Sequence, residues 1–226
     1  MTASAAARGR FITFEGGEGA GKTLQARVLA RRLETLGVKV VSTREPGGSP
    51  RAEALRELIL SGEAARYGVA GEALLLSAAR IDHLDVTIEP ALARGDWVVC
   101  DRFADSTRAY QGAAGRLDRA FVMRLERIVV GPTRPDLTLI LDLPAEQGLA
   151  RAAARRCAEV EPDRFEGEGL AFHETLRRAF LEIAREEPER CAVVDSTGSE
   201  DEVAEAIWGV VSRKLAKFLP SEAEAS

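Results

Sequence analysis

The stretch Phe11–Thr23 reads FITFEGGEGAGKT, and the rest of the chain is interpreted around it. Phe11, Ile12 and Phe14 are aromatic or β-branched, a composition typical of a buried strand. The segment Gly16–Thr23 matches G-x-x-x-x-G-K-[ST], a pattern in which the backbone N–H groups of a glycine-rich loop surround a polyphosphate. The residues that follow are typical of a helix, whose N-terminus also attracts anions. The sequence therefore predicts a triphosphate site between a strand and a helix.

Within this loop we expect Lys22 to reach the β- and γ-phosphates and the Thr23 hydroxyl to ligate Mg²⁺. A glycine-rich turn with an accidental lysine is the alternative, and the strand before it and the helix after it argue against that alternative. The predicted triphosphate site consists of Gly16, Gly17, Glu18, Gly19, Ala20, Gly21, Lys22 and Thr23.

Short apolar segments alternate with helical patterns along the whole chain. The expected strands are 11–14, 38–41, 97–100, 137–141 and 191–194. The expected helices are 22–36, 51–60, 72–94 with a break at Pro90, 105–111, 117–130, 145–156, 170–186 and 201–218. This alternation predicts an α/β fold, a five-stranded parallel sheet between two layers of helices as in P-loop NTPases. Ligands of such sheets bind beyond the carboxyl ends of the strands.

The composition limits the possible partners and the cell compartment. The chain has 226 residues and a net charge of −5, so no basic surface indicates a nucleic acid polymer or a membrane as partner. Residues 1–10 have no apolar signal sequence and the three cysteines show no pairing pattern, which predicts a cytoplasmic protein. We expect a disordered extension at 1–9, one P-loop domain at 10–218 and an acidic disordered tail at 219–226.

Three classes of P-loop protein were considered: GTPase switches, mechanical or assembly ATPases, and small-molecule kinases. The chain contains no asparagine, so the N-K-x-D guanine signature is absent. Asp101 and Arg102 end a strand expected beside the P-loop strand, where the acid can orient Mg²⁺ and the arginine can bind an acceptor phosphate. A structural role at the strand end and an ordinary salt bridge are the respective alternatives. The pair favours a kinase.

Several motifs together resemble bacterial thymidylate kinase, a nucleoside monophosphate kinase family, from about Arg10 to Leu215. They are FEGGEGAGKT, TREPGG (43–48), AAR (78–80), DRFADSTRAYQG (101–112), RPDLTLILD (134–142) and DRFE (163–166). The resemblance implies Mg²⁺-dependent transfer of a phosphoryl group from ATP to dTMP by a homodimer. It also implies that Arg102 holds the dTMP phosphate, that Arg80 bonds thymine O4 and that Tyr110 excludes a 2′-hydroxyl. Glu18 would lie near the sugar 3′-hydroxyl and the metal.

The resemblance assigns the remaining site residues as well. The predicted dTMP site consists of Glu15, Arg44, Pro46, Leu76, Arg80, Arg102, Ser106, Thr107, Tyr110, Gln111, Asp163 and Glu166. The predicted metal site consists of Thr23 and Asp101. The predicted catalytic residues are Lys22, Arg102, Arg155, Glu18 and Asp101. A LID at about 155–169 would supply an arginine that covers the transfer, with Arg151, Arg155 and Arg156 as candidates and Arg151 assigned to the ATP.

One position departs from the family pattern. Leu76 stands where the family usually has a phenylalanine that stacks on the thymine, so stacking worth ~1 kcal/mol is expected to be lost. A related nucleotide kinase for another base is therefore the second interpretation. A non-enzymatic ATP-binding subunit is the third, and turnover of any monophosphate would exclude it.

Overall fold

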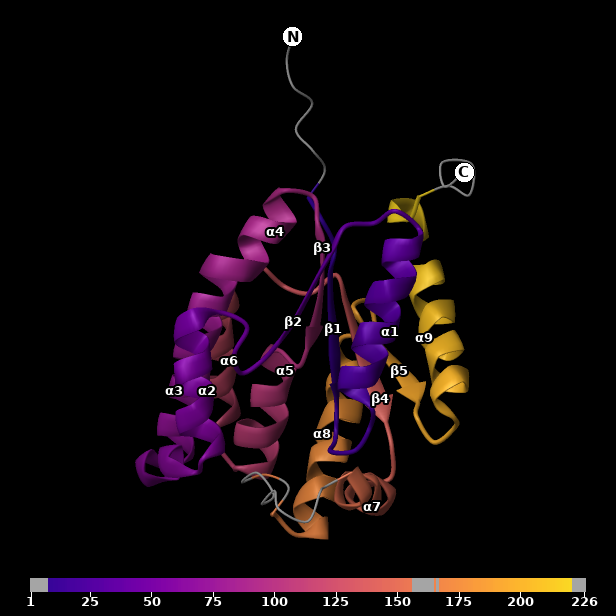
Figure 1. Cartoon of the computed structure of the whole chain (residues 1–226). Coiled ribbons are helices and arrows are strands. Elements are labelled where there is room, and N and C mark those ends of the chain that lie inside the picture. Colours follow the sequence, from indigo (N-terminus) through magenta and orange to yellow (C-terminus); the bar gives the residue numbers. More distant parts are fainter. Residues whose placement is uncertain (1–7, 156–164, 166, 221–226) are drawn as a thin grey trace.

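The computed structural model describes residues 8–155, 165 and 167–220, and its centre is a parallel five-stranded sheet (Figure 1). The strands are β1 (Phe11–Gly16), β2 (Val40–Arg44), β3 (Trp97–Asp101), β4 (Leu137–Asp142) and β5 (Cys191–Asp195). They lie in the order β2-β3-β1-β4-β5, and every neighbouring pair is parallel. The predicted α/β fold is confirmed, and the P-loop begins at the carboxyl end of the central strand.

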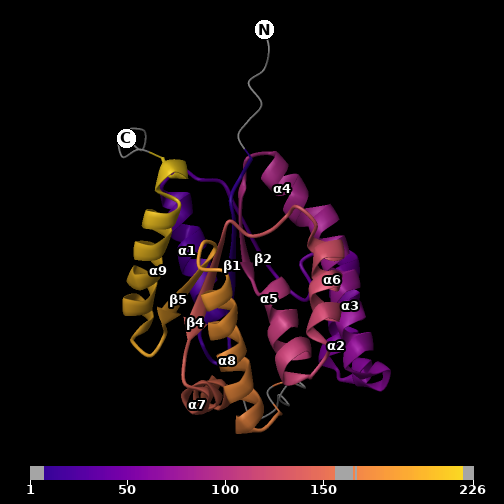
Figure 2. The same cartoon turned by 180° about the vertical axis from the view of Figure 1, so that it is seen from behind.

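Helices cover both faces of the sheet, as Figures 1 and 2 show from opposite sides. One face is covered by α1 (Lys22–Thr35) and α9 (Glu200–Lys214), the latter followed by η4 (Ala216–Phe218). The other face is covered by η2 (Leu84–Ile88), α4 (Glu89–Ala93), α5 (Ala104–Thr107), η3 (Arg108–Ala114) and α8 (Leu170–Glu186). The remaining helices are α2 (Pro50–Leu60), η1 (Glu63–Tyr67), α3 (Gly68–His83), α6 (Arg119–Val130) and α7 (Ala145–Arg155).

Side chains of β1 alternate between the two faces, as the period of two in a strand requires. Ile12 and Phe14 pack in the core beneath α1 and α9. Phe11 points to the opposite core, where its ring meets the edge of Phe103 with 4.9 Å between the centroids. Glu15 therefore belongs to the face of Phe11, beneath the segment that follows β3, and this placement matters for the site.

The sequence predicts a helix break at Pro90, but the structure has none there. The chain stays helical from Gly68 to Ala93, and a π-helical turn at Leu84–Ile88 directly precedes α4, in which Pro90 is the second residue. Proline has no N–H to donate and needs room in the preceding turn. A widened turn supplies that room, so the local backbone adapts and the helix continues.

The ends of the described chain reach slightly beyond the predicted domain boundaries. Gly9 N–H donates to Leu92 O at 2.9 Å, which fixes a residue assigned to the disordered extension. Leu219 packs against the core beneath α1 and α9. Residues 1–7 and 221–226 lie outside the described residues. Within the described part of the chain, the structure has no helix that is both long and apolar enough to cross a membrane.

Candidate active site

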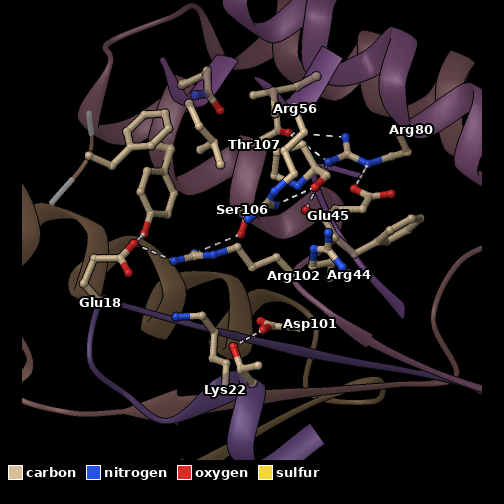
Figure 3. A pocket seen from close by; sticks show the side chains of 18 of the residues that line it. Glu18, Lys22, Arg44, Glu45, Arg56, Arg80, Asp101, Arg102, Ser106 and Thr107 are labelled. Carbon is tan, nitrogen blue, oxygen red and sulfur yellow. Dashed lines mark hydrogen bonds and ion pairs between the residues drawn. The ribbon is translucent and has the colours of Figure 1, made fainter. Parts of the chain in front are cut away.

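A cavity of about 370 Å³ lies at the carboxyl ends of β1, β2 and β3 (Figure 3). Its polar walls come from the P-loop, from the loop after β2, from α3 and from the segment after β3. Lys22 and Asp101 lie at one end, Arg80 and Thr107 at the other, and Arg102 lies between them (Figure 3). The lining residues are Glu18, Gly19, Gly21, Lys22, Thr23, Arg44, Glu45, Pro46, Arg56, Leu60, Leu76, Arg80, Asp101, Arg102, Phe103, Ser106, Thr107, Tyr110, Gln111 and Phe165.

The P-loop holds the Lys22 ammonium over its own backbone. Nζ donates to Gly16 O at 3.1 Å and to Gly17 O at 2.6 Å. Burial, together with the nearby Arg102 guanidinium, lowers the pKa of Lys22 to about 8. A polyphosphate in the cavity would favour the charged ammonium, because it adds negative charge where the dielectric constant is low.

The P-loop also packs closely against α7, and glycine makes this approach possible. Gly19 has a φ of +69°, and a Cβ on it would lie 2.0 Å from Gly148 O. Any larger residue at position 19 would push α7 away from the loop. The start of the segment that leads to the predicted LID is thus placed by the nucleotide loop itself.

Asp101 and Thr23 form a pair at the P-loop end of the cavity. The Thr23 hydroxyl donates to Asp101 Oδ2. The other carboxylate oxygen, Oδ1, is buried and has no hydrogen-bond partner among the described residues. Mg²⁺ is bound in phosphotransferases by one or two protein oxygens plus phosphates and water, so these residues fit it. No group of three or more metal-ligating His, Cys, Asp or Glu residues is present in the described chain.

Arg102 is held by Glu18, which is held in turn by Tyr110. Arg102 Nη2 lies 2.5 Å from Glu18 Oε1, and the Tyr110 hydroxyl donates to the same oxygen at 2.6 Å. Burial opposes ionisation of Glu18, but Arg102 and Lys22 outweigh it and lower the pKa of Glu18 to about 2. Burial alone would lower the pKa of Arg102, and the Glu18 carboxylate instead raises it. Both groups are therefore charged throughout the neutral range.

The backbone at Arg102 has an uncommon conformation that the segment after β3 imposes. Its φ is +69°, in the left-handed region that side chains other than glycine rarely adopt. Arg102 N–H donates to Phe14 O at 2.9 Å, which ties the residue to β1. Glu15 accepts from Phe103 N–H at 2.8 Å, from Ser106 N–H at 3.2 Å and from the Ser106 hydroxyl at 2.7 Å. These contacts aim the Arg102 side chain into the cavity.

Glu15 itself lies beneath this segment and not at the cavity wall. Its side chain is fully buried, and burial, followed by the nearby Asp105 carboxylate, raises the pKa of Glu15 to about 8. The sequence had assigned Glu15 to the dTMP site. The structure instead places it one layer behind Ser106, which does line the cavity.

Arg80 closes the opposite end of the cavity with its guanidinium fixed on several sides. Nε donates to Glu45 Oε2 at 2.7 Å, Nη2 donates to Phe103 O at 3.2 Å, and both Nη atoms approach Thr107 Oγ1 at 3.2–3.3 Å. Leu76, from the same helix, also lines the cavity. The predicted base-reading residues Arg80, Leu76 and Thr107 are thus brought together.

The other predicted residues vary in their placement. Arg44 lines the cavity but is half exposed and pairs with Glu53 at 3.0 Å. Gln111 lines it and donates to Glu72 at 2.6 Å. Arg151 donates to Ser196 O at 2.9 Å and to Thr197 O at 3.1 Å, beyond β5 and away from the cavity. Gly16, Gly17 and Ala20 belong to the P-loop without lining the cavity, whereas Pro46 lines it.

Several predicted residues lie outside the described part of the chain. They are Arg156, Asp163, Glu166 and most of the LID at 155–169. Arg155 ends α7, and its side chain is likewise outside the description. Their roles stay predictions.

The structure adds cavity residues that the sequence interpretation missed. They are Glu45, Arg56, Leu60, Phe103 and Phe165. Arg56 comes from α2 and donates to Pro46 O at 2.7 Å. An arginine within an amphipathic helix gives no local signal of a binding role, whereas Glu45 lay inside the quoted TREPGG segment and could have been included.

Comparison with known proteins agrees with this geometry. A profile of the thymidylate kinase family matches residues 14–207. This chain belongs to that family. The thymidylate kinase of Rhodopseudomonas palustris (strain TIE-1) is 56% identical over 209 residues, 92% of this chain and 90% of that protein. The thymidylate kinase of Afipia carboxidovorans is 54% identical over 96% of this chain and 95% of its own length.

The fold comparison leads to the same family. The crystal structure of thymidylate kinase from Ehrlichia chaffeensis superposes with a TM-score of 0.73 at 32% identity, covering 90% of this chain and 99% of that one. The resemblance to thymidylate kinases and the P-loop kinase class predicted from the sequence are confirmed.

Proposed function

We propose that this protein transfers the γ-phosphoryl group of ATP to dTMP, giving dTDP and ADP. The observation that carries the proposal is one cavity that has the P-loop lysine at one end, Arg80 and Thr107 at the other and Arg102 between them. A dTMP molecule with its base near Arg80 would place its phosphate near Arg102. Family membership supports the same substrate pair.

Positioning and charge compensation perform most of the proposed chemistry. An acceptor phosphate with nearly two negative charges must approach a triphosphate with about four. Lys22 and Arg102 offset this repulsion and hold the reacting groups together. The attacking phosphate oxygen is already ionised, so no protein side chain has to remove a proton from it. We assign Mg²⁺ to Asp101 and Thr23, where it would neutralise charge that develops on the phosphates.

Base selection follows from the hydrogen-bond inventory of Arg80. A guanidinium has five N–H groups and no acceptor. Contacts to Glu45, Phe103 and Thr107 use four of these five donors, which leaves one N–H on Nη1 for a ligand in the cavity that Arg80 lines. Such a donor fits the keto oxygen O4 of thymine and opposes the amino group of cytosine. Leu76 would cover the face of the base.

We assign the arginine that covers the transfer to Arg155. The guanidinium of Arg151 donates to the carbonyl oxygens of Ser196 and Thr197 and so lies beyond the cavity. This position fits contact with ATP better than contact with the transferred group. Arg156 and Arg151 are the other two candidates, and substitution of Arg155 distinguishes them from it.

We also propose that two copies of the chain form a dimer through α3, η2 and α6. Exposed apolar side chains gather on these neighbouring helices: Leu74, Ile81, Val86, Phe121 and Ile128. Leu74 and Ile81 are seven residues apart, as are Phe121 and Ile128, so each helix presents one stripe. A second copy would bury both stripes. The free, buried thiols of Cys100 and Cys191 support a cytoplasmic location.

The test is a panel of nucleoside monophosphates with ATP and Mg²⁺, with dTMP, dUMP, dCMP, dGMP and UMP as acceptors. We expect dTMP to have the highest kcat/KM. A higher value for another base would favour the second interpretation, a kinase with a remodelled base site around Leu76. Nucleotide binding without turnover of any acceptor would refute the enzymatic proposal.

A further inference from the structure

His83 is the last residue of α3, and its fully buried ring lies behind the cavity. Nδ1 lies 3.1 Å from Glu45 Oε1, and Nε2 lies 2.7 Å from Thr43 Oγ1. The second oxygen of the same carboxylate accepts from Arg80 Nε at 2.7 Å. Glu45 thus bridges an imidazole and a guanidinium, and all three side chains are almost completely buried.

This arrangement is the same in either charge state of the ring. With a neutral ring, Nδ1–H donates to Glu45 and Nε2 accepts from the Thr43 hydroxyl. With a protonated ring, Nε2–H donates to the Thr43 oxygen and the contact to Glu45 is strengthened. The ring therefore fixes the carboxylate from behind, because both of its nitrogens are engaged.

Close packing holds the ring itself in place. Gly48 lies against it, and a Cβ on Gly48 would stand 2.4 Å from His83 Nε2. The loop after β2 is thereby pressed onto the imidazole, and Glu45 leaves that loop toward Arg80. Tight packing transmits a displacement of one group to the next, since no void absorbs it.

We propose that His83 is a positioning residue for base selection, which holds Glu45 so that Arg80 presents its remaining Nη1–H group to the base edge at a fixed angle. The inference rests on the proposed function of the cavity. His83 itself does not line the cavity, so it would act through Glu45 and Arg80, which do. An arginine held at Nε by a fixed carboxylate cannot rotate its guanidinium, and hydrogen-bond selectivity requires such a fixed donor.

Two substitutions of His83 separate this role from a structural one. In His83→Asn the amide nitrogen can take the place of Nδ1 and keep the contact to Glu45. In His83→Gln the amide reaches the position of Nε2 and keeps the contact to Thr43 instead. We expect His83→Gln to raise the KM for dTMP roughly tenfold, as loss of one charge-assisted hydrogen bond would, with kcat little changed. We expect His83→Asn to remain close to the unsubstituted protein.

The preference between bases is the decisive measurement. In His83→Gln the ratio of kcat/KM for dTMP to that for dCMP should fall roughly tenfold, while the KM for ATP stays unchanged. Thr87→Val is the matched control, because the Thr87 hydroxyl donates to Gly48 O at 2.8 Å and so ties the same loop without touching Glu45. This control should leave both the KM for dTMP and the base ratio unchanged.

An unchanged KM for dTMP and base ratio in folded His83→Gln would overturn the inference. Equal changes in the KM for dTMP and in the base ratio in His83→Gln, His83→Asn and Thr87→Val would overturn it too. They would indicate that the substitutions act only by loosening the loop after β2. If His83→Gln does not fold, Thr43→Val tests the same chain of contacts by removing the far anchor of the ring, and it should shift both quantities in the same direction. Failure of the proposed function is distinguishable, because the unsubstituted protein would then not phosphorylate dTMP.

Discussion

Replacing Arg102 by lysine is the sharpest test of the proposed acceptor site. Arg102 gives one N–H to Glu18 at 2.5 Å, and Nη1 makes only long contacts to Ser106 Oγ at 3.4 Å and Gly16 O at 3.5 Å. Donors therefore remain for two hydrogen bonds to a phosphate. Lysine keeps the charge but replaces a two-point contact by a single one.

The magnitude follows from the lost hydrogen bond. A hydrogen bond to a charged group is worth about 1.5–3 kcal/mol, which corresponds to a factor of roughly 10–150 in kcat/KM for dTMP. Arg102→Ala removes both contacts and also leaves Glu18 buried without its charge partner, so its loss should be larger. The KM for ATP should change little in Arg102→Lys, because lysine keeps a positive charge beside Glu18 and the P-loop lysine, Lys22, is unchanged.

A coupled assay of ADP formation with dTMP varied at saturating ATP measures these values. Arg44→Lys is the comparison, since Arg44 lines the same cavity but is half exposed and pairs with Glu53. Its loss should stay within about fivefold, as expected for an exposed pair. If Arg102→Lys falls within about threefold of the unsubstituted enzyme, or if it raises mainly the KM for ATP, Arg102 does not hold the acceptor phosphate.

Four further outcomes are expected. The pKa of Lys22 is about 8, so at pH 8.5 its amine is mostly neutral, and a bound triphosphate favours the ammonium. ATP binding at this pH should therefore take up about three-quarters of a proton, measured by calorimetry in two buffers. Proton uptake near zero would contradict this. Asp101→Asn should raise the Mg²⁺ concentration for half-maximal activity about tenfold with the KM for dTMP unchanged; an unaltered Mg²⁺ requirement would remove Asp101 from the metal site. Ile128→Glu should give a folded monomer by light scattering, whereas the control Val193→Glu, at an exposed position of β5, should remain a dimer. A dimer that persists in Ile128→Glu would reject the interface through α3 and α6. Arg155→Ala should lower kcat by on the order of 10³ with ATP affinity maintained, and a loss below about tenfold assigns the role to Arg156 or Arg151.

The sequence predicts the sheet, the P-loop and the Asp101–Arg102 pair because each of them follows from a short local pattern of residues. The P-loop pattern specifies its own backbone, and Asp101 follows directly from the end of a short apolar strand. Strand β3 pairs with β1, and Phe14 lies opposite Asp101. This pairing places Arg102, the next residue, beside the P-loop. The positions of the strand ends were therefore sufficient to predict this part of the site.

The sequence interpretation of Glu15 did not take account of which way its side chain points. Glu15 follows Phe14 in a strand, so it faces the opposite side of the sheet and lies beneath Ser106 rather than in the cavity. The period of two could have shown this, had it been applied to the last residues of β1. Pro90 was misread for a different reason, since a π-helical turn before it cannot be seen in the residue pattern.

Three arginines of the cavity are paired with carboxylates, and this pairing explains how a chain of net charge −5 can bind two highly charged anions. Arg102 pairs with Glu18, Arg80 with Glu45 and Arg44 with Glu53. An unpaired buried guanidinium would cost several kcal/mol, so Glu18 and Glu45 offset that cost for Arg102 and Arg80 in the free protein and fix the orientation of both arginines. Glu18 engages one N–H of Arg102, and the contacts of Arg80 leave one N–H on its Nη1, so both guanidinium groups keep donors for a ligand. Glu18 and Glu45 therefore preorganise the site, and the affinity for anions comes from oriented donors rather than from an excess of positive charge.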